Sequence, residues 1–489
     1  MNAWRVEVID SQTGGEQLSR ANEKPVLPAH GAALHGLAVL LVVLAASSLR
    51  AEVSTYPGSA GIAPSMHYRV EVAQHGRTQP SFVYSTQAQW RSNRSKDTSW
   101  TAFSFAGRVT VTVTKLRGAF SRCRVLPSSR GIQPRVQGNT AVFDLDRPAK
   151  LAVEFDESIE HPLLVFADPP ENNIPERGQP DVIWFGPGVH DLGEGLTARA
   201  GQTVYLAGGA FVKGRIRGTN ASGAAIRGRG VLSGEHLPQG GDHLLQLGGW
   251  QTRGALVEDV TLVGSPHYNI VLDGQSNVVR NVKMLSWWFS TDGVGIGSQG
   301  LVEDCFFKVN DDALKLYHSG MRVRDCVFWQ MENGAPFQIS WNMPGDNHGF
   351  RVSNCDVIRV EHQWNNPNEA VFDSIHGGSG HMRDYVFENI RIENCAWRLF
   401  HLAIATNEFA KATTRGRISN LTFRNVSVDG PLKMPSLIMG WDAEHRIEDI
   451  TMENLRIGGK LITNAAAGNF EIDPATTRNI RFAVPRSKP

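Results

Sequence analysis

The chain has 489 residues, enough for two or three ordinary domains or for a small domain followed by a long solenoid. Its 49 basic and 48 acidic residues leave a formal net charge of +1, which gives no electrostatic attraction toward nucleic acid or an anionic membrane. With 41% hydrophobic and 20% charged residues, the composition is that of a globular protein and excludes a disordered one. Glycine, at 49 residues, exceeds the usual share of about 7% and favours a turn-rich, β-rich chain.

The first 51 residues have the features of a leader. The apolar run 36–46 is followed by Ser-Ser-Leu-Arg-Ala (47–51). It is shorter than the ~20 apolar residues that span a bilayer, but it matches the hydrophobic region and cleavage site of a secretory signal. We therefore expect export, with a mature chain that begins near Glu52 and has no further membrane segment. Because the preceding polar stretch carries few positive charges, a retained anchor or a misplaced start codon are the alternatives.

Residues 52–168 contain short segments in which apolar and polar side chains alternate. Alternation with a period of two, at spacings of roughly ten residues and with turn residues between, predicts a β-sandwich. The segments are 67–72, 81–85, 100–105, 108–113, 140–145 and 151–155. The following stretch, 169–180, is rich in proline and has no apolar period, which predicts a linker.

Residues 181–489 are built on a repeat. Eight copies share an apolar residue, a polar residue, Asn or Asp, and then an apolar–polar–apolar run; they begin at Val257, Val279, Val302, Val323, Val352, Phe387, Phe423 and Met452. Such a period predicts a right-handed parallel β-helix with about 20–30 residues per coil. The third-position Asn or Asp suits a tight turn, since both residues tolerate the left-handed conformation. The predicted fold class is all-β: a right-handed parallel β-helix preceded by an N-terminal β-sandwich.

Three of the five cysteines occupy one position of this repeat. Cys305, Cys326 and Cys355 stand where other copies have Val, Ile or Leu. We expect them to stack inside the coil as small hydrophobic residues, with a disulfide between neighbouring coils as the alternative. The odd total, without a CxxC motif or histidines at metal-binding spacing, argues against a metal site.

Two polar breaks between apolar runs carry three acidic residues. Asp292 lies in Ser-Thr-Asp-Gly (290–293), and Asp311 and Asp312 lie in Asn-Asp-Asp-Ala (310–313). The breaks are 19 residues apart (311 − 292), about one coil, so they would lie one above the other on strands roughly 4.8 Å apart. Adjacent residues of a strand face opposite sides, so both Asp311 and Asp312 reach one surface only if the chain bends at Asn310.

Converging carboxyl groups are the machinery of glycosidic bond hydrolysis. In an inverting glycosidase a protonated carboxyl protonates the leaving oxygen, and a carboxylate about 6.5–9.5 Å away activates water; in a retaining enzyme the separation is roughly 5–5.5 Å. Like charges at close range raise one pKa and keep one group protonated. The alternative is that the three aspartates are ordinary turn residues.

These residues also carry a family resemblance. Residues 290–293 and 310–320 resemble the signature of glycoside hydrolase family 49, the dextranase and isopullulanase family, and 335–341 resembles the strand that follows. The resemblance implies that Asp311 is the general acid, that Asp292 and Asp312 activate the water, that the product is inverted, and that neither metal nor cofactor is needed. Polygalacturonases of family 28 share the β-helix and a similar acidic trio. The chain lacks their Gly-His-Gly and Arg-Ile-Lys motifs, so the family 49 reading is preferred.

Several residues around the trio are candidates for substrate binding. Lys315 is placed to bind a sugar hydroxyl or tune an aspartate, or alternatively to pair with a neighbouring acid. The aromatic candidates form a stacking platform or are ordinary packing residues, and the amides are candidates for hydrogen bonds with hydroxyls. The main candidates are Asn310, Lys315, Trp288, Gln338, Trp341 and Asn342, and further candidates are Trp287, His267, Asp373 and His376.

The sequence therefore predicts a secreted or periplasmic, inverting, dextranase-like glycoside hydrolase that acts on a polysaccharide as a monomer. One alternative is a polygalacturonase-type pectin hydrolase, whose uronate substrate calls for a basic cleft; Lys308, Lys315 and Arg324 could supply it. A non-catalytic glycan-binding β-helix and a Ca²⁺-dependent lyase are the others.

Overall fold

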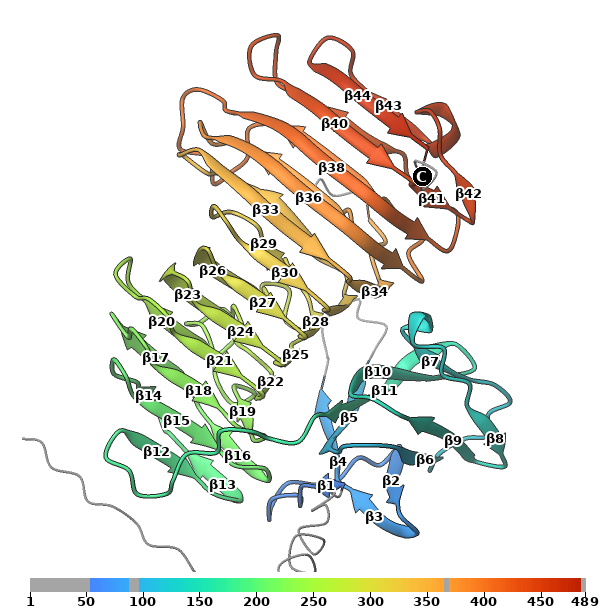
Figure 1. Cartoon of the computed structure of the whole chain (residues 1–489), viewed down its shortest axis with the longest axis vertical. Coiled ribbons are helices and arrows are strands. Elements are labelled where there is room, and N and C mark those ends of the chain that lie inside the picture. The colour runs from blue at the N-terminus through green and yellow to red at the C-terminus, as the bar shows by residue number, and fades with distance from the viewer. Residues whose placement is uncertain (1–52, 88–95, 365–368, 485–489) are drawn as a thin grey trace, which may run out of the picture. The chain divides into compact units, whose positions relative to one another are not determined.

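The computed structural model describes residues 53–87, 96–364 and 369–484, and the predicted leader lies outside these ranges (Figure 1). Within them the regular elements are β-strands and two 3₁₀ turns, η1 (Ser128–Arg130) and η2 (Ala466–Gly468). No helix in the described part of the chain is long and apolar enough to cross a membrane. The predicted all-β class is confirmed.

The N-terminal part is a sandwich of two sheets. The six-stranded sheet contains β1 (Ser54–Thr55), β4 (Val83–Gln87), β5 (Asp97–Ser104), β7 (Cys123–Leu126), β10 (Ala149–Phe155) and β11 (Ser158–Asp168). The five-stranded sheet contains β2 (Tyr68–Gln74), β3 (Arg77–Ser81), β6 (Val109–Lys115), β8 (Arg135–Gln137) and β9 (Thr140–Leu145). Alternate side chains of each sheet point inward, as Val70 and Val111 do from one sheet and Leu151 and Val165 from the other, and all four are fully buried. The period-two pattern thus becomes one shared core.

The chain then winds into a parallel β-helix with three strands per coil, coloured from green to red in Figure 1. The first face contains β12 (Val182–Phe185), β15 (Thr203–Leu206), β18 (Ala225–Arg227), β21 (Leu256–Glu258), β24 (Val278–Arg280), β27 (Leu301–Glu303), β30 (Arg322–Arg324) and β33 (Asn347–Ser353). The second face contains β13 (Gly188–Asp191), β16 (Ala210–Lys213), β19 (Val231–Ser233), β22 (Thr261–Val263), β25 (Lys283–Leu285), β28 (Phe306–Val309), β31 (Val327–Gln330) and β34 (Asp356–Val360).

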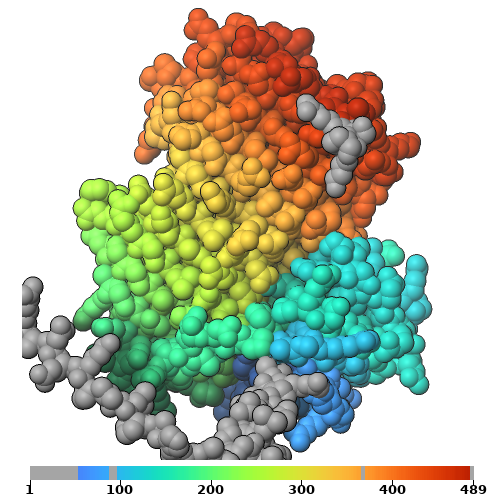
Figure 2. Space-filling model, viewed as in Figure 1, coloured from blue at the N-terminus to red at the C-terminus, as the bar shows by residue number. Residues whose placement is uncertain are grey.

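In the last coils single strands run across both of these faces. They are β36 (His381–Ile392) and β38 (Arg417–Val428), followed by β40 (Ile447–Glu453), β41 (Arg456–Ile457), β42 (Lys460–Leu461) and β44 (Thr477–Ala483). The third face is a separate eleven-stranded sheet of β14 (Leu196–Thr197), β17 (Ile216–Thr219), β20 (Leu245–Gly248), β23 (Ile270–Gln275), β26 (Val294–Ser298), β29 (Leu314–Lys315), β32 (Phe337–Ser340), β35 (Phe372–His376), β37 (Phe400–Ile404), β39 (Ser436–Met439) and β43 (Phe470–Ile472). Successive coils stack into the continuous surface of Figure 2.

The turn between the first two faces is made by the Asn or Asp of the repeat. All eight of these residues have φ between 51° and 73°, the left-handed region that Asn and Asp tolerate best: Asp259, Asn281, Asp304, Asp325, Asn354, Asn389, Asn425 and Asn454. In the later coils their side chains hydrogen-bond to each other, with Asn389 Nδ2 donating to Asn354 Oδ1 (3.1 Å) and Asn425 Nδ2 to Asn389 Oδ1 (3.0 Å). The turn predicted from the repeat is confirmed.

The fourth repeat position lines the interior. Cys305, Cys326 and Cys355 are fully buried there, in the same core as Val260 and Val282. All five cysteines are free thiols, so the predicted interior ladder is confirmed and the alternative of a disulfide is excluded.

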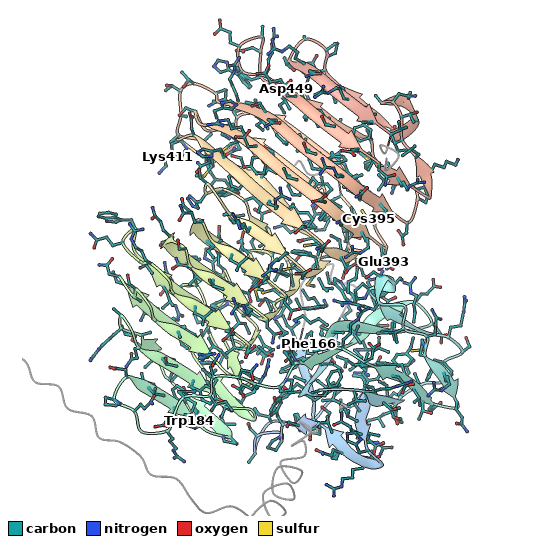
Figure 3. All side chains as sticks on the ribbon, in the orientation of Figure 1. Phe166, Trp184, Glu393, Cys395, Lys411 and Asp449 are labelled. Carbon is teal, nitrogen blue, oxygen red and sulfur yellow. The ribbon has the colours of Figure 1, made fainter. Side chains whose placement is uncertain are left out.

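The sandwich packs against the second face of the β-helix. Phe166, labelled in Figure 3, meets Phe306 edge-on at 5.1 Å between ring centroids. Beside this contact Asp168 Oδ2 forms ion pairs with Lys283 Nζ (2.6 Å) and Arg229 Nη1 (3.2 Å). All three side chains are almost completely buried. Removing one partner of such a buried cluster costs about 3–5 kcal/mol, because it leaves an unpaired charge in the interior. The junction is therefore a rigid support for the central coils.

Candidate active site

The three aspartates meet where the second face turns into the third. Asp292 immediately precedes Gly293 and β26, and Asp311 and Asp312 lie between β28 and β29, one coil further on. One carboxylate oxygen of each lies within 4.8 Å of the others. The chain bends at Asn310 and Asp311 instead of continuing as a strand. This bend, on which the sequence argument depended, turns both adjacent aspartates toward one cavity.

Asn310 holds the bend from below. It is fully buried; its Nδ2 donates to the Trp287 carbonyl (2.9 Å), and its Oδ1 accepts from the Asn333 backbone amide (3.0 Å). Its own amide donates to Thr291 Oγ1 (3.2 Å). The side chain of Asn310 bonds within the protein and is not among the described residues that line the cavity, so its contact with substrate stays a prediction.

Lys315 joins two of the three carboxylates. Its Nζ lies 2.6 Å from Asp292 Oδ1 and 2.7 Å from Asp312 Oδ2. The ammonium also lies over the rings of Tyr268 (5.2 Å) and Tyr317 (5.6 Å). Asp311 has no ion pair with this lysine among the described contacts; its Oδ2 accepts from Asn333 Nδ2 (3.0 Å) and its Oδ1 from the Asp312 amide (2.8 Å). The site thus separates one carboxyl from a lysine-bridged pair.

The electrostatics divide the carboxyls in the same way. Burial, followed by the charges of Asp292 and Asp312, raises the pKa of Asp311 well above its ordinary value. Burial also raises the pKa of Asp292 to about 7, although Lys315 opposes the rise. For Lys315, burial lowers the pKa but Asp292 and Asp312 outweigh it, so the pKa is raised and the ammonium persists. Asp311 and Asp292 therefore both hold a proton more tightly than an ordinary aspartate, and of the two only Asp292 pairs with Lys315 among the described contacts.

These groups line a cavity of about 620 Å³ on the third face. Of the predicted residues, Asp292, Asp311, Asp312, Lys315, Trp341, Asn342 and His267 lie on its wall. Sequence reasoning missed Tyr268, Phe289, Tyr317, Asn333, Glu408 and Phe409, which also line it. Tyr317 could have been found, because it follows Lys315 by two residues. Phe409 could not, because it comes from the loop after β37, three third-face strands beyond β29.

The remaining candidates lie behind the wall. Gln338 and Asp373 are fully buried, and Gln338 Nε2 donates to Asp373 Oδ1 (3.2 Å) and toward Asp312 Oδ1 (3.5 Å). His376 is buried between Ser340 Oγ (2.7 Å) and the Gly380 carbonyl (2.8 Å). Trp288 is half-buried and contacts Phe289, and it is Phe289 that reaches the cavity. Gln338 and Trp288 thus contact wall residues, and their direct contact with substrate stays a prediction.

Three polar atoms on the cavity wall have no hydrogen-bond partner within the described protein. They are the Tyr317 hydroxyl, Trp341 Nε1 and Asn342 Oδ1, and each is buried. Buried polar groups are nearly always hydrogen-bonded in native proteins. The cavity therefore offers two donors and an acceptor to a polar ligand, beside the faces of aromatic rings.

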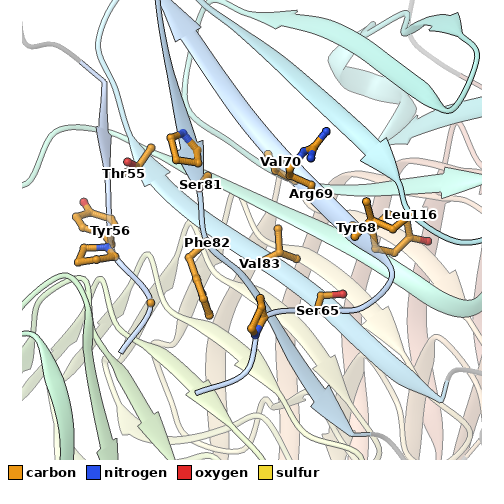
Figure 4. A pocket seen from close by; sticks show the side chains of 14 residues that line it. Thr55, Tyr56, Ser65, Tyr68, Arg69, Val70, Ser81, Phe82, Val83 and Leu116 are labelled. Atoms are coloured by element: carbon orange, nitrogen blue, oxygen red, sulfur yellow. The ribbon is translucent and has the colours of Figure 1, made fainter. Parts of the chain in front are cut away.

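A second cavity, in the sandwich, differs from the third-face cavity in its lining. A cavity of about 550 Å³ in the sandwich is lined mostly by apolar side chains such as Tyr56, Phe82 and Leu116, with Arg69 as its one charged residue (Figure 4). The described lining of this cavity contains no cluster of converging acidic groups.

The described residues do not place the basic cleft that a uronate polymer requires at the third-face cavity. Lys308 is buried beside Trp329, 4.8 Å from the ring centroid, and Arg324 pairs with Glu303.

Known proteins resemble this chain in sequence and in fold. No family model matches it. A dextranase of Arthrobacter sp. (strain CB-8) is 28% identical over 346 residues, which cover 60% of this chain and 53% of the relative. An isopullulanase of Aspergillus niger is 22% identical over 495 residues, covering 82% of this chain and 87% of the relative. Dex49A from Penicillium minioluteum has a solved structure with a TM-score of 0.71 at 19% identity, covering 87% of this chain and 96% of that one.

The chain spans about half the length of the bacterial dextranases that it matches. The solved structure confirms the predicted fold class, a β-helix preceded by a β-sandwich, and the relatives confirm the resemblance drawn from the two acidic motifs. The chain is thus a homologue of dextranases and isopullulanase, and its fold is that of Dex49A.

Proposed function

We propose that the protein is a dextranase-like glycoside hydrolase in which Asp311 is the general acid and Asp292 and Asp312 activate the attacking water. The observation that carries the proposal is the division of the trio by Lys315. One carboxyl with a strongly raised pKa stands beside two carboxylates that share an ammonium at 2.6 and 2.7 Å. A site that only binds glycan has no need of three converging carboxyls, whereas acid–base hydrolysis requires both protonation states side by side.

In this reaction Asp311 transfers its proton to the glycosidic oxygen as the bond to the anomeric carbon breaks. A water molecule held by Asp292 and Asp312 attacks that carbon, and one of the two carboxylates takes the water proton. Lys315 opposes the rise in the pKa of Asp292 that burial causes, and so favours its ionised form. Proton exchange with solvent then restores the starting protonation states.

The stereochemical outcome needs its own support. The nearest carboxylate oxygens lie within 4.8 Å, which is shorter than the ~6.5–9.5 Å typical of two-carboxyl inverting enzymes. By that spacing alone, retention would be favoured. The proposal of inversion depends instead on the resemblance to family 49 and on the pair Asp292 and Asp312, since two carboxylates bridged by one lysine can hold a water where a single nucleophile would otherwise stand.

The proposed substrate is a neutral α-glucan of the dextran type. The relatives named dextranase support it, and so do the rings of Phe289, Trp341 and Phe409 on the cavity wall, which suit the apolar faces of sugar rings. The orphaned polar atoms of Tyr317 and Asn342 suit hydroxyl groups. Lys315 is the one lysine or arginine on the described wall, and its charge is already shared by two carboxylates, so a galacturonan is the weaker candidate.

The test is a screen of the purified protein against dextran, pullulan and polygalacturonate, with new reducing ends as the readout. We expect activity on dextran that Asp311→Asn abolishes while the far-UV circular dichroism spectrum stays unchanged. Full activity in that variant would refute the assignment of the acid. Export remains a prediction from the leader, and N-terminal sequencing of protein from the medium would check cleavage after Ala51.

A further inference from the structure

We propose that His67, Asp97 and His161 form a binding site for one divalent transition-metal ion, Zn²⁺ by its ligand chemistry, on the N-terminal sandwich. Potential ligand atoms of the three side chains lie within 4.8 Å of one another. In the described part of the chain the acidic trio is the other cluster of this kind. The two differ in chemistry, because the sandwich cluster offers two imidazoles and one carboxylate instead of three carboxylates.

The distances suit shared ligation better than direct hydrogen bonding. His67 Nε2 lies 3.7 Å from Asp97 Oδ2, beyond the ~2.7–3.2 Å of a good hydrogen bond. Two ligands each about 2.0–2.1 Å from a tetrahedral Zn²⁺ stand roughly 3.3 Å apart. His161 adds a buried Nδ1 that has no hydrogen-bond partner in the described protein. The cluster is thus slightly open, with an unsatisfied nitrogen at its edge.

The backbone fixes the three side chains relative to one another. Asp97 begins β5, and His161 lies in β11, its parallel neighbour; the Lys96 amide donates to the Glu160 carbonyl (2.7 Å) beside both. His67 immediately precedes β2 of the opposite sheet, and the hydroxyl of Tyr68 donates to the His161 carbonyl (2.6 Å). The ligands therefore come from both sheets of the sandwich, and their backbones lie in or next to strands.

The rings of His67 and His161 stack at 4.0 Å between centroids, so the two imidazoles lie side by side. Two imidazoles and a carboxylate are a common ligand set for Zn²⁺ and leave a fourth position for water. Binding requires the nitrogen ends of the stacked rings to rotate toward Asp97.

An entry route is present. His67 and Asp97 lie on the wall of a cavity of about 530 Å³ that also contains Glu235 and His236 from the β-helix. An ion held by His67, Asp97 and His161 would tie the two sheets together beside this cavity. The site is distinct from the acidic trio, so its expected effect is on stability and not on the hydrolytic reaction.

The experiment is calorimetric titration of Zn²⁺ into the metal-free, untagged, full-length protein, together with thermal unfolding with and without the ion. We expect one Zn²⁺ bound per chain and a rise in the unfolding midpoint of about 2 °C or more at saturation. His67→Ala and His161→Ala should each weaken binding by at least ~10-fold and remove the thermal shift. His348→Ala, which removes an exposed histidine of β33, is the matched control and should change neither.

Two further readings make the outcome decisive. Zn²⁺ held by the acidic trio would persist in the variant with both His67→Ala and His161→Ala and would disappear in Asp311→Asn, and that pattern would overturn the proposal. Absence of saturable binding by the wild-type protein would overturn it as well. The far-UV circular dichroism spectrum of each variant shows whether the sandwich has folded, and Asp97→Asn, which keeps the side-chain volume, should lose affinity even where an alanine variant fails to fold.

Discussion

The lysine bridge is the feature whose removal tests the electrostatics most sharply. In Lys315→Met the side chain keeps most of its volume, but Asp292 and Asp312 lose an ammonium at 2.6 and 2.7 Å. A nearby opposite charge typically lowers a carboxyl pKa by about 1–3 units, so its removal should raise the pKa of Asp292 by a similar amount from about 7. Asp292 would then be largely protonated at neutral pH.

The consequence is a shift of the acidic limb of the pH–rate profile. A carboxylate base works only when ionised, so activity falls as the pH drops through its pKa. With a pKa of about 7, roughly one tenth of Asp292 is ionised at pH 6, and each unit of increase in the pKa removes about another factor of ten. We therefore expect Lys315→Met to move the acidic limb upward by about 1–3 pH units and to cut the rate at pH 6 by at least ~10-fold.

The assay is release of reducing ends from dextran between pH 4 and 10, with kcat and KM separated. Lys315→Arg retains the positive charge and is the matched control, and its acidic limb should stay close to that of the wild type. Thermal unfolding of both variants separates loss of fold from loss of charge. An unshifted acidic limb in a folded Lys315→Met protein would refute the role given to the bridge.

Substitutions at four other residues should each have a measurable effect. Asp311→Asn should lower kcat by at least about 10²–10⁴, the usual contribution of a general acid, and wild-type kcat on dextran would contradict this. Trp341→Ala should raise KM for dextran more than it changes kcat, because the ring on the cavity wall contacts substrate in the ground state and the transition state alike; an unchanged KM would place the ring outside the binding site. Asn310→Ala should cost about 1–3 kcal/mol in urea unfolding, since the Trp287 carbonyl and the Asn333 amide lose a buried partner; stability equal to the wild type would show that the bend does not need this amide. Burial raises the pKa of Glu369 from 4.5 to about 9, so the folded state binds this proton more tightly than the unfolded state and stability falls as the pH rises between those values; Glu369→Gln should flatten that decline in thermal unfolding, and an identical slope would contradict it.

The fold could be predicted because short-range patterns in the sequence specify it. In the six-residue repeat, the Asn or Asp at the third position favours a left-handed turn by its own local conformation. All eight copies adopt this turn. The ladder through Cys305, Cys326 and Cys355 follows from the same register, since equivalent positions of successive coils must stack.

The convergence of the acidic trio was predictable for a similar reason, because Asp292 lies one coil before Asp311 and Asp312 and both segments carry their own sequence signature. The cavity wall was not. Phe409 reaches it from the long loop between β37 and β38, where no spacing rule applies. Asn310 and Gln338 are residue types that commonly bind ligands. Only the folded structure shows that the side-chain amide of Asn310 bonds to Trp287 and Asn333, and that of Gln338 to Asp373. The sandwich cluster of His67, Asp97 and His161 joins residues 94 apart (161 − 67), so no local pattern announced it.

The central claim is that a water molecule held by Asp292 and Asp312 attacks the anomeric carbon while Asp311 donates the proton. Proton NMR of the first products from dextran tests it most directly, read within minutes and before mutarotation mixes the anomers. We expect the newly formed reducing ends to appear first as the β-anomer, because a single displacement inverts the α-linkage. Initial appearance of the α-anomer would mean net retention, as the short spacing between the carboxylates would favour, and would contradict the roles assigned to Asp292 and Asp312.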